Sequence, residues 1–327
     1  MSVIKTLQYI SHGSSKTGGY RHEWMLGNYL AQTLHVTFKE YRAALNFKGL
    51  TGFLRLWRYA FKHANGNINL TVQRMILPVL LAGILNNRKT IVVLHHYDKR
   101  EQNSWLYHLN VSFLIHLLKL NLNKLKVVVV ADYWKDWLID KGVNESSIYV
   151  VPNLFDTEVY AMVKHSIIKR NQIYLGQFGA KQHPLIFEIA EDLKAAGYHC
   201  FFSTTSPEGT HIAANYEVKH LSFEAYLKEL AASLYTVCLT SFNEGWNRTA
   251  HESLMLGTPV IGNNAGGLGQ LLKEAHQPIV STKEEVIALI LQKQNIHIPE
   301  SLFKQYHINQ ILYYAKPLVA YCSNGFS

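Results

Sequence analysis

A chain of 327 residues is long enough for one large domain or two ordinary domains, with an apolar core in each. Hydrophobic residues make up 48% of it and charged residues 17%, a balance that excludes an intrinsically disordered protein. The three cysteines, Cys200, Cys238 and Cys322, are far apart, and no Cys-x-x-Cys or His-Glu-x-x-His pattern occurs. We therefore expect buried thiols in a reducing compartment and no metal site.

The excess positive charge lies in the first half. Residues 1–165 contain 20 Lys and Arg against 10 Asp and Glu, whereas residues 166–327 contain 12 against 13. This asymmetry predicts that the first half meets something anionic, such as lipid headgroups, a phosphorylated lipid acceptor or nucleic acid. The N-terminus lacks the apolar core of a signal peptide, and the apolar stretch Met75 to Leu85 is too short to span a bilayer. We expect a cytoplasmic protein, with peripheral attachment to the cytoplasmic face of a membrane left open.

The first half alternates predicted strands with predicted helices. We expect strands over residues 5–10, 68–72, 90–94, 126–131 and 148–151, and helices over about 20–34, 75–85 and 104–121. The loop after the first strand contains Gly18-Gly19 and leads into a helix, a geometry that suits the approach of a phosphate. A plain tight turn explains these glycines about as well. Gly19-Tyr20 stands where a P-loop has Lys-Ser/Thr, so we reject a P-loop NTPase.

Two further features of the first half are open to two interpretations each. His95 follows the strand 90–94, where α/β folds place functional groups, although a histidine there is often only a polar terminator. Within residues 47–63, Arg55, Arg58 and Lys62 share one helical face, while most of another is apolar. That pattern fits a basic amphipathic helix on an anionic membrane surface, or equally a domain helix with its apolar stripe on the core.

The second half restarts the alternation after a polar, basic segment, residues 157–171, which we interpret as the connection between two domains. Strands are expected over residues 172–175, 199–204 and 235–240, near 218 and from 259, and helices over 184–196, 223–234, 284–291 and 308–321. About six strands in each half predict two doubly wound domains. We place them at residues 1–160 and 161–305, with a final helix, 306–327, that could return to the first domain.

The densest motif in the chain is Glu244-Gly-Trp-Asn-Arg-Thr-Ala-His-Glu252, which follows the strand 235–240. Gly257-Thr-Pro-Val-Ile261 and Gly266-Gly267 come after it. Two carboxylates suit sugar or ribose hydroxyls, and the N–H groups of a helix that starts near Arg248 or Thr249 suit a phosphate. A site with both properties is what a nucleotide sugar requires. The alternative is that Glu244 is a loop acid and Glu252 an ordinary exposed helix residue.

This motif resembles the Glu-x(7)-Glu signature of the retaining glycosyltransferases of family 4 (group 1), which have the GT-B fold. Trp246 replaces the Phe of the family pattern and Asn247 replaces its Gly, while the spacing and the later turns agree. The resemblance covers most of the second half and isolated points of the first. It implies two Rossmann-like domains facing across a cleft, and a metal-independent enzyme without a cofactor, since no Asp-x-Asp triplet occurs.

The resemblance also implies roles for individual residues. Glu252 would hold the ribose and Glu244 the sugar, with His95 and Glu244 nearest the reaction. The remaining residues implied to bind the donor are Gly18, Gly19, Lys181, Gly245, Trp246, Asn247, Arg248 and Thr249. The donor would be a nucleoside-diphosphate sugar, most simply UDP- or GDP-linked. The acceptor would be a glycan or a lipid-linked molecule, as in surface polysaccharide or glycolipid synthesis.

Two positions depart from the family pattern at the expected site. Gln177 stands where the family has an Arg that clamps the diphosphate, and Gln270 stands where it usually has Glu. These departures keep two alternatives open: a sugar-nucleotide epimerase of the same architecture, and a non-catalytic sugar-nucleotide binding protein. Specific nucleic-acid binding is not expected, because the basic half carries no recognisable module for it.

Overall fold

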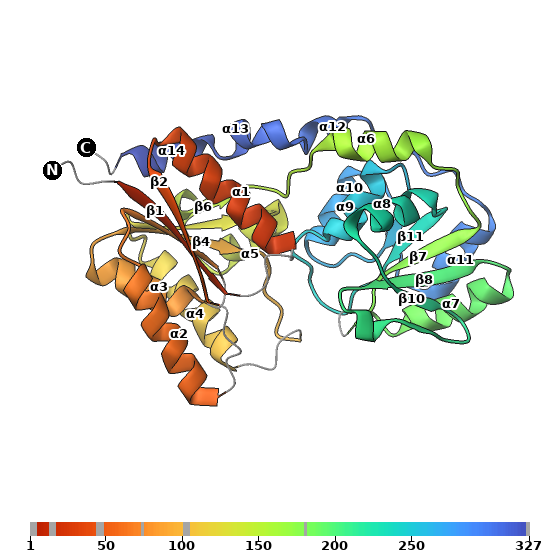
Figure 1. Cartoon of the computed structure of the whole chain (residues 1–327), viewed down its shortest axis with the longest axis horizontal. Coiled ribbons are helices and arrows are strands. Elements are labelled where there is room, and N and C mark those ends of the chain that lie inside the picture. Colours follow the sequence, from red (N-terminus) through yellow and green to blue (C-terminus); the bar gives the residue numbers. More distant parts are fainter. Residues whose placement is uncertain are drawn as a thin grey trace. The chain divides into compact units, whose positions relative to one another are not determined.

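A computed structural model describes residues 5–12, 18–43, 49–72, 75–100, 105–179 and 182–324. The chain forms two compact units (Figure 1). Unit 1 comprises the described residues of Met1–Leu154 and of Asn309–Ser327, and unit 2 comprises those of Phe155–Ile308. The sequence-based boundaries were set at 160 and 305, a few residues from these two divisions.

Unit 1 is built on a six-stranded parallel sheet in the order β2-β1-β3-β4-β5-β6. Its strands are β1 (Thr6–His12), β2 (Thr37–Ala43), β3 (Ile68–Val72), β4 (Lys89–Leu94), β5 (Leu125–Val129) and β6 (Ile148–Val150). Every residue of β3 and β5 is buried, including the polar residues Asn69 and Thr71 of β3 and Lys126 of β5. The edge strand β2 is largely exposed and rich in polar residues, so the sequence analysis did not identify it.

Helices cover both faces of this sheet. They are α1 (Gly18–Thr33), α2 (Gly49–His63), α3 (Ile76–Leu85), α4 (Trp105–Lys119) and α5 (Asp132–Asp140). Leu56 and Ala60 of α2 pack with Met75 and Val79 against Ile10 of β1. In Figure 1, α2, α3 and α4 lie on one side of the sheet and α1 on the other. This is the doubly wound arrangement that alternating strands and helices predict.

The end of the chain completes unit 1. The segment expected as one helix over 308–321 is divided into α13 (Ile311–Tyr314) and α14 (Lys316–Ser323), with Pro317 in the first turn of α14. Leu318 and Cys322 are fully buried, and the Nζ of Lys89 at the start of β4 donates to the carbonyl oxygens of Tyr321 and Cys322. Residues far apart in sequence therefore share one core.

Unit 2 has a second six-stranded sheet, in the order β12-β11-β7-β8-β10-β9. Its strands are β7 (Gln172–Gln177), β8 (His199–Thr204), β9 (His211–Ile212), β10 (Glu217–His220), β11 (Tyr235–Cys238) and β12 (Val260–Gly262). Among the strands that the structure describes in this sheet, only β9 is antiparallel to its neighbour, and this short exposed strand was missed by the sequence analysis. The three cysteines of the chain are buried and free, as expected.

Unit 2 contains helices before, between and after its strands. They are α6 (Thr157–Ser166), α7 (Leu185–Ala195), α8 (Phe223–Ala232), α9 (Arg248–Met255), α10 (Gly267–Glu274), α11 (Lys283–Leu291) and α12 (Ser301–Gln305). The interpretation of residues 157–171 as a plain connection was wrong for its first part. Asp156 caps α6 by accepting from the N–H of Glu158, and Tyr160 anchors the helix by being buried.

The burial of Leu318 gives a test of the composite core of unit 1. Leu318→Ala removes a fully buried side chain, and we expect it to lower the free energy of unfolding by about 2 to 4 kcal/mol. The matched control is Leu312→Ala, three residues after the start of Asn309–Ser327, because Leu312 is 63% exposed. Urea unfolding of both variants measures the difference. Equal losses of stability in both would contradict the packing described above.

Candidate functional site

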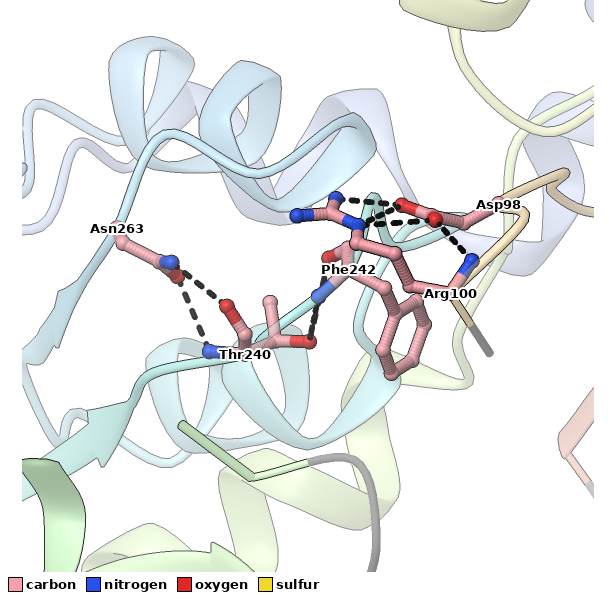
Figure 2. Close-up of polar contacts among 5 residues, drawn as sticks. All are labelled: Asp98, Arg100, Thr240, Phe242 and Asn263. Atoms are coloured by element: carbon pink, nitrogen blue, oxygen red, sulfur yellow. Dashed lines mark hydrogen bonds and ion pairs between the residues drawn. The ribbon is translucent and has the colours of Figure 1, made fainter. Parts of the chain in front are cut away.

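The loop after β11 is fixed to the loop after β12 by side-chain to backbone hydrogen bonds (Figure 2). The amide of Asn263 donates to the carbonyl oxygen of Thr240 over 2.8 Å, and its Oδ1 accepts from the N–H of Thr240 over 3.2 Å. The Oγ1 of Thr240 lies 3.2 Å from the carbonyl oxygen of Phe242 and bends the chain away from the strand. The two loops therefore form one rigid edge of the sheet.

Glu244 is held at that edge by the double-glycine turn. The N–H of Gly267 donates to the carbonyl oxygen of Glu244 over 2.9 Å, and the N–H of Glu244 donates to that of Ala265. A Cβ atom on Gly267 would lie 1.8 Å from the carbonyl oxygen of Gly245, and Gly266 has a φ of 62°. Both glycines are therefore required by the close approach of two backbones, which explains their presence in the motif.

Asn247 starts helix α9. It adopts the left-handed conformation with a φ of 57°, and its Oδ1 accepts from the N–H of Ala250 over 2.9 Å. Asn tolerates this conformation better than most residues other than Gly, so it satisfies the position where the family pattern has Gly. The side chain of Asn247 acts as a helix cap here.

Glu252 is the centre of what we call the unit 2 cluster, made of Tyr160, Tyr226, Arg248 and Glu252. The Nη2 of Arg248 lies 3.1 Å from Oε1 of Glu252, and only 7% of the Glu252 side chain is exposed. The hydroxyl of Tyr160 donates to Oε1 over 3.4 Å and that of Tyr226 donates to Oε2 over 3.0 Å. The interpretation of Glu252 as an ordinary exposed helix residue is therefore wrong.

The surroundings keep the phenol of Tyr226 protonated and the guanidinium of Arg248 in place. Burial, and then the charge of Glu252, raises the pKa of Tyr226 well above its ordinary value, so this hydroxyl remains a donor. Arg248 stacks over the ring of Phe155 at 4.6 Å. The hydroxyl of Tyr226 also lies 3.3 Å from Oγ1 of Thr249, which connects the cluster to the first turn of α9.

Trp246 and His251 form a second buried pair beside this cluster. The indole Nε1 of Trp246 donates to Nδ1 of His251 over 2.8 Å, and both residues are almost completely buried. The ring of His251 also packs against Phe155 and Tyr306. Burial, and then the charge of Arg248, lowers the pKa of His251 well below its ordinary value, so its ring is neutral. This pair anchors the side chain of Trp246 away from solvent.

Three other positions of the expected donor site are Lys181, Gln177 and Gln270. Lys181 lies outside the described residues. Gln177, at the end of β7, is exposed. Gln270 donates to Oε1 of Glu274 over 2.8 Å, and Glu274 also accepts from the hydroxyl of Tyr306. Gln270 is therefore part of a hydrogen-bonded chain within unit 2.

Unit 1 carries a cluster that the sequence analysis found only in part. His95, directly after β4, has its Nε2 2.7 Å from Oε1 of Glu23 in α1. The hydroxyl of Tyr9 donates to the other oxygen of Glu23. A Cβ atom on Gly19 would lie 3.3 Å from Nε2 of His95, so Gly19 leaves room for the ring. We refer to Tyr9, Glu23 and His95 as the unit 1 cluster. Gly18 begins α1 one residue earlier.

The chain after His95 turns through a tight acid–base pair (Figure 2). Arg100 binds Asp98 through Nη2 at 2.6 Å, through Nε at 3.0 Å, and through its backbone N–H at 2.8 Å. Asp98 is 6% exposed, so this pair stabilises the conformation of the loop. Within the described parts of the chain, no group of three or more His, Cys, Asp or Glu residues is arranged to hold a metal ion.

Comparisons with known proteins agree with this architecture. The sequence matches no protein-family model and no curated protein. Its structure is similar to that of a glycosyltransferase from Rickettsia africae, with a TM-score of 0.64, 15% identity, and coverage of 99% of this chain and 94% of that one. Anabaena Alr3699/HepE in complex with UDP and glucose follows, with a TM-score of 0.61, 12% identity, and coverage of 98% and 93%.

A third similar structure is UDP-GlcNAc 2-epimerase from Methanocaldococcus jannaschii, with a TM-score of 0.56, 11% identity, and coverage of 95% of this chain and 99% of that one. At such identities the likeness establishes the fold alone. The chain has the GT-B fold, with two Rossmann-like sheets whose strands are mostly parallel. The predicted fold class is confirmed.

The neutral His251 predicts a specific pH dependence of stability. Its pKa in the folded state lies below the ordinary 6.5, so below pH 6.5 the unfolded chain binds a proton that the folded chain does not. The contribution of the neutral His251 to the free energy of unfolding is therefore fully present above pH 6.5. It is lost as the pH falls below 6.5, by at most about 1.4 kcal/mol per pH unit. We expect His251→Leu to lose stability less steeply below pH 6.5 than the unsubstituted protein does.

The control for this prediction is His297→Leu, because His297 is an exposed histidine of the same unit. Urea unfolding at several pH values gives the slopes for the three proteins. A slope for His251→Leu as steep as that of His297→Leu would contradict the neutral state of His251.

Proposed function

We propose that this protein is a glycosyltransferase that takes a sugar from a nucleoside-diphosphate sugar and transfers it to a glycan or lipid-linked acceptor. The observation that carries the proposal is the unit 2 cluster, in which a buried carboxylate lies on α9 beside a helix start and a double-glycine turn. A carboxylate held in this way is suited to accept hydrogen bonds from ribose hydroxyls. UDP in the similar Anabaena structure supports a uridine or similar nucleotide.

We assign the donor-binding roles residue by residue. Glu252 accepts from the ribose, and Glu244, with the backbone N–H groups of Gly245, Trp246 and Asn247, contacts the sugar. Thr249, Lys181 and the N-terminal turn of α9 face the diphosphate. Arg248 lies on Glu252 and Phe155, so in this arrangement its charge acts first on the carboxylate. Gly18, Gly19 and His95 are the contribution of unit 1.

The proposed reaction is retaining and metal-independent and needs no cofactor. Negative charge builds on the leaving diphosphate as the bond from the sugar breaks. Fixed cations and N–H dipoles stabilise that charge without reorganisation, which is the main source of rate enhancement in such a site. The leaving phosphate oxygen receives the proton of the acceptor hydroxyl. Synthesis of a surface polysaccharide or glycolipid is the process we propose for it.

One observation favours a second candidate, a sugar-nucleotide epimerase. The unit 1 cluster places a buried carboxylate and a histidine together, which are the acid and base groups that an epimerase needs. The similar UDP-GlcNAc 2-epimerase structure has the same fold. Incubation with nucleotide sugars in the absence of an acceptor separates the two, because only an epimerase converts its substrate to a second nucleotide sugar. Donor binding without turnover would indicate a non-catalytic binding protein.

Glu252→Gln tests the donor site while preserving the shape of the side chain. Hydrogen bonds to a charged group contribute about 1.5 to 3 kcal/mol, so we expect affinity for UDP or GDP to fall by about tenfold to a hundredfold. Isothermal titration calorimetry measures it. The control is Glu229→Gln, because Glu229 is also partly buried and paired with an arginine but contacts Gln172 at the opposite, amino end of β7. Unchanged affinity in Glu252→Gln would rule out this assignment.

We further propose that α2 lies on an anionic membrane surface. Leu56 and Ala60 of α2 point into the core, whereas Leu54 is 57% and Phe61 36% exposed. Leu54, Trp57 and Phe61 follow a helical spacing of three and four, with the partly buried Trp57 stacked on Phe61, so Leu54 and Phe61 expose a second apolar stripe. Arg55, Arg58 and Lys62 are exposed beside this stripe. Within the described residues, no helix is long and apolar enough to cross a bilayer.

The membrane proposal predicts salt-sensitive binding to vesicles that contain phosphatidylserine. Each basic side chain near an anionic surface contributes about 1 kcal/mol, so neutralising Arg55, Arg58 and Lys62 to Gln should weaken binding by about a hundredfold. A variant with Lys194, Lys273 and Lys293 changed to Gln loses the same charge from exposed sites in unit 2 and serves as the control. Vesicle sedimentation measures both. Equal binding to neutral and anionic vesicles would refute the proposal.

A further inference from the structure

Glu23 is a buried carboxylate that no sequence motif indicates. It lies on α1, is 6% exposed, and its two oxygens face different partners. Oε2 accepts from the hydroxyl of Tyr9 on β1, and Oε1 lies 2.7 Å from Nε2 of His95. Burial, followed by the charge of Glu23, raises the pKa of Tyr9, so its phenol stays protonated and donates. Both oxygens of Glu23 therefore act as acceptors.

This geometry determines which nitrogen of His95 carries the proton. An ionised carboxylate has no hydrogen to donate, so Nε2 must be the N–H donor of the 2.7 Å contact. In the neutral ring, Nδ1 then carries a lone pair and is an acceptor. Nδ1 has no hydrogen-bond partner within the described part of the chain. A carboxylate that fixes a histidine tautomer in this way is a common second partner of functional histidines.

The environment leaves His95 accessible for a ligand. Its side chain is 16% exposed, in contrast with 7% for Glu23. The ring of His22 meets the ring of His95 edge to face at 5.5 Å and is itself held by the carbonyl oxygen of Val151. Among the described residues, the charged and titratable groups that contact His95 are Glu23 and His22 from α1, with Tyr9 of β1 behind Glu23.

We propose that Glu23 is a positioning residue that makes Nδ1 of His95 a hydrogen-bond acceptor for a hydroxyl of the donor sugar. This inference rests on the proposed function, since the ligand is a nucleotide sugar. The contact orients the sugar through its hydroxyl. Glu23 itself touches no substrate in this scheme. Tyr9 restrains Glu23 from the other side and has a weaker influence on His95.

The direct test is a spectroscopic one on the whole protein. Selective 15N labelling of histidine, with His95→Gln to assign the resonances, reports which ring nitrogen carries the proton. We expect an unprotonated Nδ1 and a protonated Nε2 in the unsubstituted protein. Glu23→Gln should increase the fraction with a protonated Nδ1 several-fold, because an amide N–H₂ can donate to Nε2. A protonated Nδ1 in the unsubstituted protein overturns the inference and leaves the proposed function intact.

The second measurement is on substrate. Addition of UDP-glucose, UDP-galactose or GDP-mannose should shift the Nδ1 resonance of His95, whereas UDP or GDP alone should not. Glu23→Gln and Glu23→Leu should lower kcat/KM for the nucleotide sugar by about tenfold or more, about 1.4 kcal/mol, while affinity for UDP or GDP is unchanged. Tyr9→Phe, which leaves the contact between Glu23 and His95 in place, should lose no more than about threefold.

The outcomes separate the inference from the proposed function. Failure of all the nucleotide sugars and of UDP and GDP to bind would overturn the proposed function and, with it, the sugar contact of His95. Binding of a nucleotide sugar without a shift at Nδ1, or full turnover by Glu23→Leu, would overturn the inference alone. Equal losses of kcat/KM and of melting temperature in Glu23→Gln and Tyr9→Phe would show that Glu23 is only structural.

Discussion

The close approach of two backbones at Gly245 and Gly267 is the constraint on which the unit 2 site depends. No side chain fits between them, because a Cβ atom on Gly267 would lie 1.8 Å from the carbonyl oxygen of Gly245. The approach allows Gly267 to bind the carbonyl oxygen of Glu244, which fixes the loop after β11 against the start of α10. The position of Glu244, of the cap at Asn247 and of the whole of α9 follows from it.

One departure of the motif from the family pattern, Trp246, depends physically on another residue of the motif. An indole at position 246 brings a buried N–H group that a phenylalanine lacks, and such a group needs an acceptor. His251, one helical turn into α9, supplies it through Nδ1. Burial, and then the charge of Arg248, lowers the pKa of His251, and the resulting neutral ring can accept this hydrogen bond. Trp246 is thus compatible with the loop because of a residue five positions away.

The sequence predicted the fold well and the site in part, for a physical reason. Strands buried on both faces and tight glycine turns restrict which residue types can occupy them. For this reason β3, β5 and the double-glycine turn could be identified from the sequence. Glu23, Tyr160 and Tyr226 act through contacts made across the fold, and nothing in their local sequence distinguishes them from surface residues. Edge strand β2 was missed because its exposed side chains carry no burial pattern.

Arg248 illustrates how the structure changes the electrostatic argument. The sequence analysis counted Arg248 among the residues implied to bind the donor. In the structure its guanidinium is paired with Glu252, four residues along α9, and is stacked on the ring of Phe155. Its charge therefore offsets the cost of burying Glu252. At the carboxyl end of the unit 2 sheet, an anion would then be bound by the backbone N–H groups of the first turn of α9 and by residues near Gln177, the exposed end of β7.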